Sequence, residues 1–203
     1  MCTNAGGGGG GGGGNFTRDE SVKKLDERAV KELEKAIHEV LNDFGLPDST
    51  VTRINGYMLF DGKGHDAIAG ANGMDQINLN PKYFSDYSKV SNLDTNGGDV
   101  IAGGIKGVAT HEVGHVVARQ VLKKMMPNST SLEIAKARKN HKAEKAIIKE
   151  AKKRYGSNPQ ISPYGSTNFS EKVAEAVSDV YTNRKRAKPY SKVIVSVMKD
   201  MLR

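Results

Sequence analysis

Five consecutive residues, His111-Glu-Val-Gly-His115, constrain this chain more than any other segment. Two histidines four residues apart lie about 40° apart around an α-helix, so both imidazoles can reach one metal ion. Glu112, beside the first histidine, then lies within reach of a water molecule on that metal. Zinc is the ion that this spacing most often binds, so the segment predicts a zinc site built on a helix.

The flanking residues predict the helix that this site requires. Apolar residues between Ile105 and Val121 recur at three- and four-residue steps, the spacing of one helix face. Thr110 and Gly114 are small, so bulky side chains need not crowd the metal. The same pattern also allows a helix whose two buried histidines bond to backbone carbonyls, and a third ligand is needed to decide between them.

Candidates for that third ligand follow in a second helical segment. Glu171, Glu175 and Asp179 are spaced four residues apart, so they lie near one helix face. Either glutamate fits the ligand position, and the next acid along would then accept a hydrogen bond from a ligand histidine. The spacing leaves both assignments open. An acidic stripe on a solvated helix, capped by Asn168 or Ser170, gives the same pattern.

These motifs resemble the catalytic domain of the anthrax lethal factor-like metallopeptidases, relatives of which occur in bacterial toxins and phage head-morphogenesis proteins. The resemblance covers roughly Gly104 to Tyr181. It implies an α+β, mostly helical zincin-like fold with a small sheet, and zinc-dependent hydrolysis of peptide bonds through a metal-activated water. The residues that carry it are His111-Glu-Val-Gly-His115, Tyr164, Thr167-Asn168, Glu171 and Ala174-Glu175-Ala176.

The resemblance also implies a role for each matching residue. Lys172 and Val173 stand where the family usually has large apolar or aromatic residues, so the packing there is expected to differ. The implied zinc ligands are His111, His115 and Glu171, the general base is Glu112, the oxyanion donor is Tyr164, and the residue that supports a ligand is Glu175.

A second resemblance favours a different ligand. Glu175-Ala-Val-Ser-Asp179 fits the E-x-x-x-D pattern of thermolysin-like enzymes, which would make Glu175 the ligand and Asp179 its support. The upstream tyrosine and the Thr-Asn pair match the lethal factor type better, so Glu171 is the preferred prediction.

The remaining sequence predicts one domain over residues 16–203. Zincin-type peptidases commonly pair an extended substrate with an edge strand, and Ile77, Asn78 and Leu79 are the candidates for this role by resemblance and position. The alternative interpretation is that Ile77, Asn78 and Leu79 form an ordinary core strand. We expect helices over 19–44, 131–155, 169–182 and 191–202, strands over 51–60 and 74–80, and a loop over 85–98.

Other features of the sequence indicate in which cellular compartment the protein acts. Residues 1–15 contain an unbroken glycine run, Gly6 to Gly14, which predicts a disordered tail or linker. The single cysteine, Cys2, cannot form an internal disulfide. No apolar run approaches the ~20 residues that cross a bilayer, and the N-terminus lacks the apolar core of a signal peptide. We therefore expect a cytoplasmic or virion-associated protein. His65, a lone loop histidine, is expected to be solvated.

The net charge of +8 permits a polyanionic partner. Many of the positive charges fall in residues 131–155, but no aromatic residue interleaves with them and no nucleic-acid-binding motif is present. We therefore expect a protein or peptide substrate, and the resemblance allows a place in a larger phage or toxin protein. The alternatives are a catalytically silent zincin-like interaction module, and a basic nucleic-acid-binding protein whose His-Glu motif is accidental.

Overall fold

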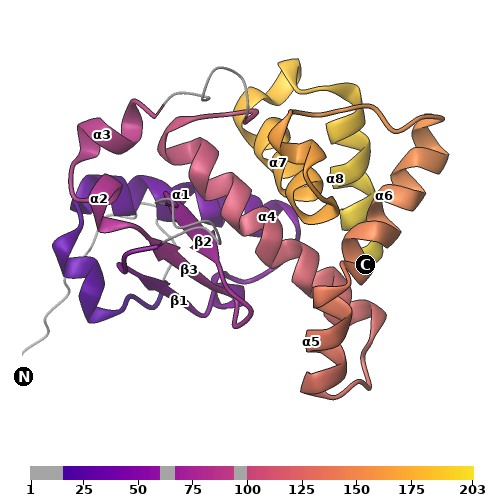
Figure 1. Ribbon diagram of the computed structural model, residues 1–203, viewed down its shortest axis with the longest axis horizontal. Coiled ribbons are helices and arrows are strands. Elements are labelled where there is room, and N and C mark those ends of the chain that lie inside the picture. Colours follow the sequence, from indigo (N-terminus) through magenta and orange to yellow (C-terminus); the bar gives the residue numbers. More distant parts are fainter. Residues whose placement is uncertain (1–15, 60–66, 94–99) are drawn as a thin grey trace, which may run out of the picture.

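The computed structural model describes residues 16–59, 67–93 and 100–203 (Figure 1). Helices dominate and three short strands form one sheet, which confirms the α+β class. The glycine run and His65 lie outside the described residues. The elements are α1 (Glu27–Asp43), β1 (Arg53–Asn55), β2 (Ala69–Ala71), β3 (Gln76–Leu79), α2 (Pro81–Phe84), α3 (Tyr87–Ser91), α4 (Gly104–Met125), α5 (Ser131–Lys139), α6 (Lys142–Tyr155), α7 (Phe169–Asn183) and α8 (Pro189–Leu202), with 3-10 helices at Glu20–Lys24, Asp48–Thr50, Tyr164–Ser166 and Arg184–Arg186.

Helix α4, which carries the His-Glu motif, runs through the middle of the molecule (Figure 1). It packs against α1 and β2 on one side and against α6, α7 and α8 on the other. Val113, Val116 and Val117 are fully buried in these contacts. Burial of a valine side chain contributes about 1.5–3 kcal/mol, so packing on several faces fixes α4 firmly in the core.

Gly114 lets α7 approach α4 closely. A Cβ atom at this position would lie 3.0 Å from the Cα of Ala174 and 3.2 Å from the Cβ of Val177, both on α7. These separations are tighter than ordinary van der Waals contact, so a larger residue would push the two helices apart. The glycine inside the motif therefore helps to set the distance between the histidines on α4 and the acids on α7.

The sheet has the strand order β1-β3-β2. Strand β3 lies in the centre, parallel to β1 and antiparallel to β2. The prediction that Ile77, Asn78 and Leu79 pair with a substrate is therefore wrong, because neighbouring strands occupy both edges of β3. Ile77 and Leu79 are fully buried core residues. The strand beside α4 is β2, at the edge of the sheet.

Two predicted helices have different bounds from those expected. The first begins at Glu27 and not near Asp19, because the Asp26 side chain accepts a hydrogen bond from the N–H of Arg28 and caps it. The helix expected over 131–155 is two helices, α5 and α6. They separate at His141, whose φ of 52° lies in the left-handed region that interrupts an α-helix.

The closing part of the chain follows the prediction more closely. Helices α7 and α8 cover the expected segments, and α8 begins at Pro189, in its first turn, where a missing N–H costs nothing. The stretch 85–98, expected as loop, contains α3, which Asp86 caps by accepting from the N–H of Ser88. Within the described residues, none of the helices is both long and apolar enough to span a bilayer.

Asp43, at the end of α1, connects this helix to α7 and α8. Its carboxylate accepts hydrogen bonds from the Tyr181 hydroxyl at 2.5 Å and from Lys199 Nζ at 2.7 Å. Partial burial raises the pKa of Asp43, but the bonds from Lys199 and Tyr181 outweigh this effect and leave the pKa below its usual value of 3.8. The ionised carboxylate is therefore the form that the fold favours.

Candidate metal centre

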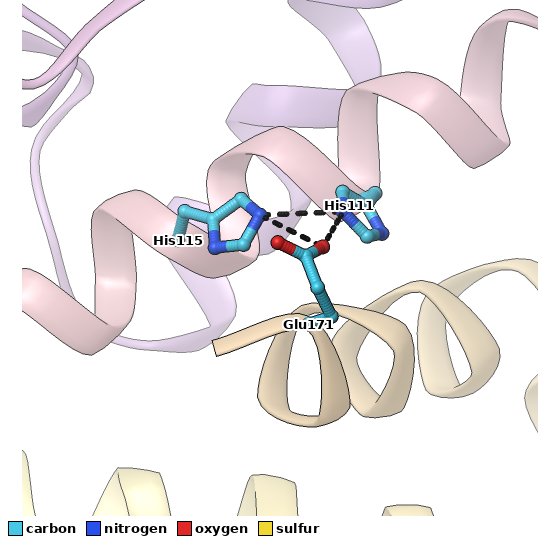
Figure 2. A group of neighbouring side chains, drawn as sticks. All are labelled: His111, His115 and Glu171. Carbon is cyan, nitrogen blue, oxygen red and sulfur yellow. Dashed lines mark hydrogen bonds and ion pairs between the residues drawn. The ribbon is translucent and has the colours of Figure 1, made fainter. Parts of the chain in front are cut away.

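Helices α4 and α7 bring three potential metal ligands together (Figure 2). Nε2 of His111 lies 3.0 Å from Oε2 of Glu171 and 3.2 Å from Nε2 of His115. His115 Nε2 lies 3.6 Å from the same Glu171 oxygen. The three ligand atoms all lie within 4.8 Å of one another, so they could hold one metal ion between them.

The start of α7 positions Glu171. The Asn168 side chain accepts hydrogen bonds from the N–H groups of Ser170 and Glu171 and so begins the helix at Phe169. Glu171 therefore occupies the first turn, where the helix dipole favours a negative charge. Ser170, beside it, lies with its hydroxyl 3.1 Å from Nδ1 of His115. The cap thus fixes both the acid and a partner for the second histidine.

Glu175 lies behind His111, on the side away from the other two potential ligands. Its Oε1 atom lies 2.9 Å from Nδ1 of His111, and its side chain is 2% exposed. Its Oε2 atom accepts hydrogen bonds from the N–H of Ile101 and from the hydroxyl of Ser162, both at 2.7 Å. In the tautomer whose proton is on Nδ1, this N–H donates a hydrogen bond to Glu175. The lone pair on Nε2 of His111 then faces His115 and Glu171.

Asp179 is buried and is not part of this group. Its carboxylate accepts hydrogen bonds from the Asn183 side chain and from the backbone N–H of Lys188, both at 2.8 Å. It therefore stabilises the turn between α7 and α8. The thermolysin-like arrangement, with Glu175 as ligand and Asp179 supporting a histidine, does not match these positions.

The electrostatics of the group favour a bound cation. Burial lowers the pKa of His111, but its hydrogen bonds with Glu171 and Glu175 outweigh this and raise the pKa to about 10. Burial raises the pKa of Glu171, yet the hydrogen bonds with His111 and His115 hold it well below its usual range. Two carboxylates thus create a negative potential at His111 that stabilises a positive charge, whether a proton or a metal ion.

Glu112 and Tyr164 line a cleft of about 470 Å³ together with the three potential ligands. Glu112 is 8% exposed, and Tyr164 is 41% exposed with its ring centroid 5.8 Å from that of His111. Burial, with the nearby charges of Glu171 and Glu112, raises the pKa of the Tyr164 phenol above its usual value. Strand β2 also lines the cleft. A volume of this size lies within the ordinary range for ligand sites.

The structure therefore brings the predicted ligands, the predicted base and the predicted oxyanion donor to one cleft. Sequence reasoning missed Ser162, which no motif marks, and also three basic residues that line the cleft, Arg119, Arg138 and His141. The four-residue step from His115 to Arg119 is the one signal that could have identified the first of these. Comparisons with protein-family models, with curated proteins and with solved structures found no match to this chain.

Proposed function

We propose that this chain is a zinc-dependent peptidase with a zincin-like fold. The observation that carries the proposal is the place of Glu112 in the same cleft as three potential metal ligands. A site that only stores a metal or stabilises the fold has no use for a nearly buried carboxylate that is not one of the ligands. The resemblance of the two motifs to lethal factor-like metallopeptidases supports the same function.

The three side chains fit a zinc ion. Two imidazole nitrogens and one carboxylate oxygen are a common donor set of catalytic zinc sites, which leave the fourth position open. Ligand atoms about 2.0–2.1 Å from a tetrahedral ion lie about 3.3–3.4 Å from one another. The separations among His111, His115 and Glu171, at 3.0, 3.2 and 3.6 Å, are close to this value. Zinc could thus bind with little movement of the side chains.

The residues around the ligands supply the other parts of a hydrolytic mechanism. When bound, zinc would supply Lewis-acid chemistry, polarising the scissile carbonyl and making a water nucleophilic near neutral pH. Glu112 accepts the proton of that water on its carboxylate and delivers it to the nitrogen of the leaving amine. Tyr164, whose pKa lies above the usual 10.0 of a phenol, keeps its proton at neutral pH and donates a hydrogen bond to the developing oxyanion.

Strand β2 provides a place for the substrate backbone. It lies at the edge of the sheet, contacts α4 and lines the cleft. An extended peptide can add to such an edge through main-chain hydrogen bonds, which give affinity without dependence on side chains. We therefore assign to β2 the role that the sequence had suggested for β3. We also propose, from the resemblance of the two motifs to lethal factor-like metallopeptidases, that the domain serves within a larger phage or toxin protein.

The experiment that tests this function combines metal analysis with turnover. We expect elemental mass spectrometry to find one zinc ion per chain in the purified wild type and in Glu112→Gln, and none in Glu171→Ala. We expect the wild type to cleave a peptide mixture and Glu112→Gln to leave it intact. Zinc binding without cleavage by the wild type would instead support the silent interaction module. Absence of stoichiometric metal after zinc is supplied would remove the basis of the peptidase proposal.

A further inference from the structure

The cleft that holds the potential metal ligands is also lined by a group of basic side chains, here called the basic end, made of Arg119, Arg138 and His141. Arg119 lies on α4 four residues after His115, so the two share a helix face. Arg138 comes from α5, and His141 precedes α6. Three separate segments thus contribute basic groups to the lining of the cleft that holds Glu112.

Arg119 has unused hydrogen-bonding capacity. Its side chain is nine-tenths buried, and its Nε donates to Oδ1 of Asp75 at 2.5 Å. Asp75 also accepts from Gln120 and Lys123, so its charge is shared between two cations. Among the described residues, Nη2 of Arg119 has no hydrogen-bond partner. A buried guanidinium nitrogen without an acceptor is costly, and a bound anion near it would lower that cost.

Gly73 has no side chain, which leaves room for Arg138 to lie directly against the backbone there. A Cβ atom there would lie within 1.6 Å of Nη1 of Arg138, so the guanidinium rests directly on the glycine backbone. The contact connects α5 to the turn between β2 and β3. In the described parts of the chain, Arg138 forms no ion pair. Arg138 is an exposed residue that lines the cleft, and its charge is not neutralised there by an ion pair with any described residue.

One acid also lies in this part of the cleft. Glu144, on α6, is 6% exposed, and its Oε2 atom has no hydrogen-bond partner among the described residues. Two arginines, one glutamate and His141 therefore line this cleft together. The acids Glu112 and Glu171 line the same cleft.

We propose that the basic end binds a carboxylate of the substrate, so that the preferred substrates are acidic peptides. This inference rests on the proposed peptidase function. Arginine binds both oxygens of a carboxylate through parallel N–H groups, and Arg138 has such a pair available. The step from His115 to Arg119 advances about 6 Å along α4. An extended peptide advances about 3.3 Å per residue, so the carboxylate belongs to a residue about two positions from the scissile bond.

The test uses zinc-loaded Glu112→Gln protein, which is expected to bind peptides without cutting them. The protein is immobilised and incubated with a synthetic library of short random peptides, and the retained peptides are sequenced by mass spectrometry. We expect Asp and Glu to be enriched about fivefold over the library. A second library with amidated C-termini separates side-chain carboxylates from the chain terminus, because enrichment that depends on the terminus disappears there.

A matched pair of second substitutions distinguishes the effect of residues that line the cleft from the effect of the general positive charge of the protein. Arg138→Gln should abolish the enrichment, whereas Lys139→Gln should retain it, because Lys139 is exposed like Arg138 but does not line the cleft. Equal loss in both variants, or survival of the enrichment in Arg138→Gln, would overturn the inference. So would a wild-type selection without acidic peptides.

Turnover by the wild-type protein on the same library separates this inference from the proposed function. Cleavage about two positions from an acidic residue supports both, and cleavage without that preference leaves a peptidase whose basic end has no role in selecting substrates. Enrichment that depends on Arg138 but is not accompanied by cleavage would support carboxylate recognition and refute the peptidase.

Discussion

Ser162 donates a hydrogen bond of 2.7 Å to Glu175, whose other carboxylate oxygen lies 2.9 Å from Nδ1 of His111. Ser162 is itself buried, and its hydroxyl accepts from the N–H of Gly165 at 2.9 Å. The orientation of a potential metal ligand therefore depends on a serine outside the motifs that identify the site. A Cβ atom at Gly165 would lie 3.0 Å from the Ser162 hydroxyl and 3.2 Å from Glu175, so glycine there keeps this arrangement compact.

Replacing Ser162 should weaken metal binding without removing a ligand. In Ser162→Ala, Glu175 loses one of the two hydrogen bonds to Oε2, and His111 is held less firmly. We expect zinc affinity to fall about tenfold, the lower end of the effect seen when a partner of a metal ligand is removed. Competition with a chromogenic chelator measures it. Ser191→Ala is the control, because Ser191 is also buried but lies on α8. Equal affinity in Ser162→Ala and the wild type would show that Ser162 does not support the site.

Glu175 and Asp179 should behave differently when each loses its charge. Glu175→Gln should weaken zinc binding by about 10–100-fold, because His111 then lacks its carboxylate partner. Asp179→Asn should leave zinc affinity unchanged and lower the free energy of unfolding by about 1–3 kcal/mol, since it weakens the bonds to Asn183 and Lys188. Chelator competition and chemical denaturation give the two quantities. A loss of zinc affinity in Asp179→Asn would favour the thermolysin-like assignment instead.

Gly114→Ala tests whether the approach of α7 to α4 sets the site. Helix propensity alone predicts that alanine stabilises this position by about 1 kcal/mol. The added methyl would meet Ala174 at 3.0 Å, so we expect a destabilisation of about 1–3 kcal/mol and weaker zinc binding as Glu171 moves away. The two arguments differ in sign, so the free energy of unfolding decides between them. A more stable variant that binds zinc normally would show that the helices adjust.

The parts of the site that sequence reasoning could predict are those set by local periodicity. Four-residue steps place His111 with His115 on one helix and Glu171 with Glu175 on another, and the structure brings the two sets together. The strand order was not predictable in this way, because Met74–Asn80 alternates in the same manner whether it is central or at an edge.

Contacts made through packing left no signal in the sequence. The bond from Ser162 to Glu175 joins residues of different segments, and the contact of Arg138 with Gly73 depends on where α5 meets the sheet. The break at His141 was missed because residues on both sides favour a helix, and only the left-handed backbone there separates α5 from α6. Tertiary packing overrides local preference at such positions.

The free energy of unfolding should depend on pH through the contact of Asp43, on α1, with Tyr181, on the site-bearing helix α7. The pKa of Asp43 is lower in the folded protein than its usual value of 3.8, so folding favours the ionised form. The resulting stabilisation is fully present above about pH 5 and is lost as the pH falls through the folded-state pKa. Asp43→Asn should therefore cost about 1 kcal/mol at pH 7, a value reduced for the partial exposure of Asp43, and almost nothing near pH 2.

Urea denaturation of both proteins at the two pH values measures this difference. Lys199→Gln should give the same pH profile, because it removes a cation that stabilises the ionised Asp43. The double variant should then lose less than the sum of the two single losses, since both substitutions remove one shared interaction. A cost of Asp43→Asn that stays constant down to pH 2 would instead mean that packing of the side chain, and not its charge, joins α1 to α7 and α8.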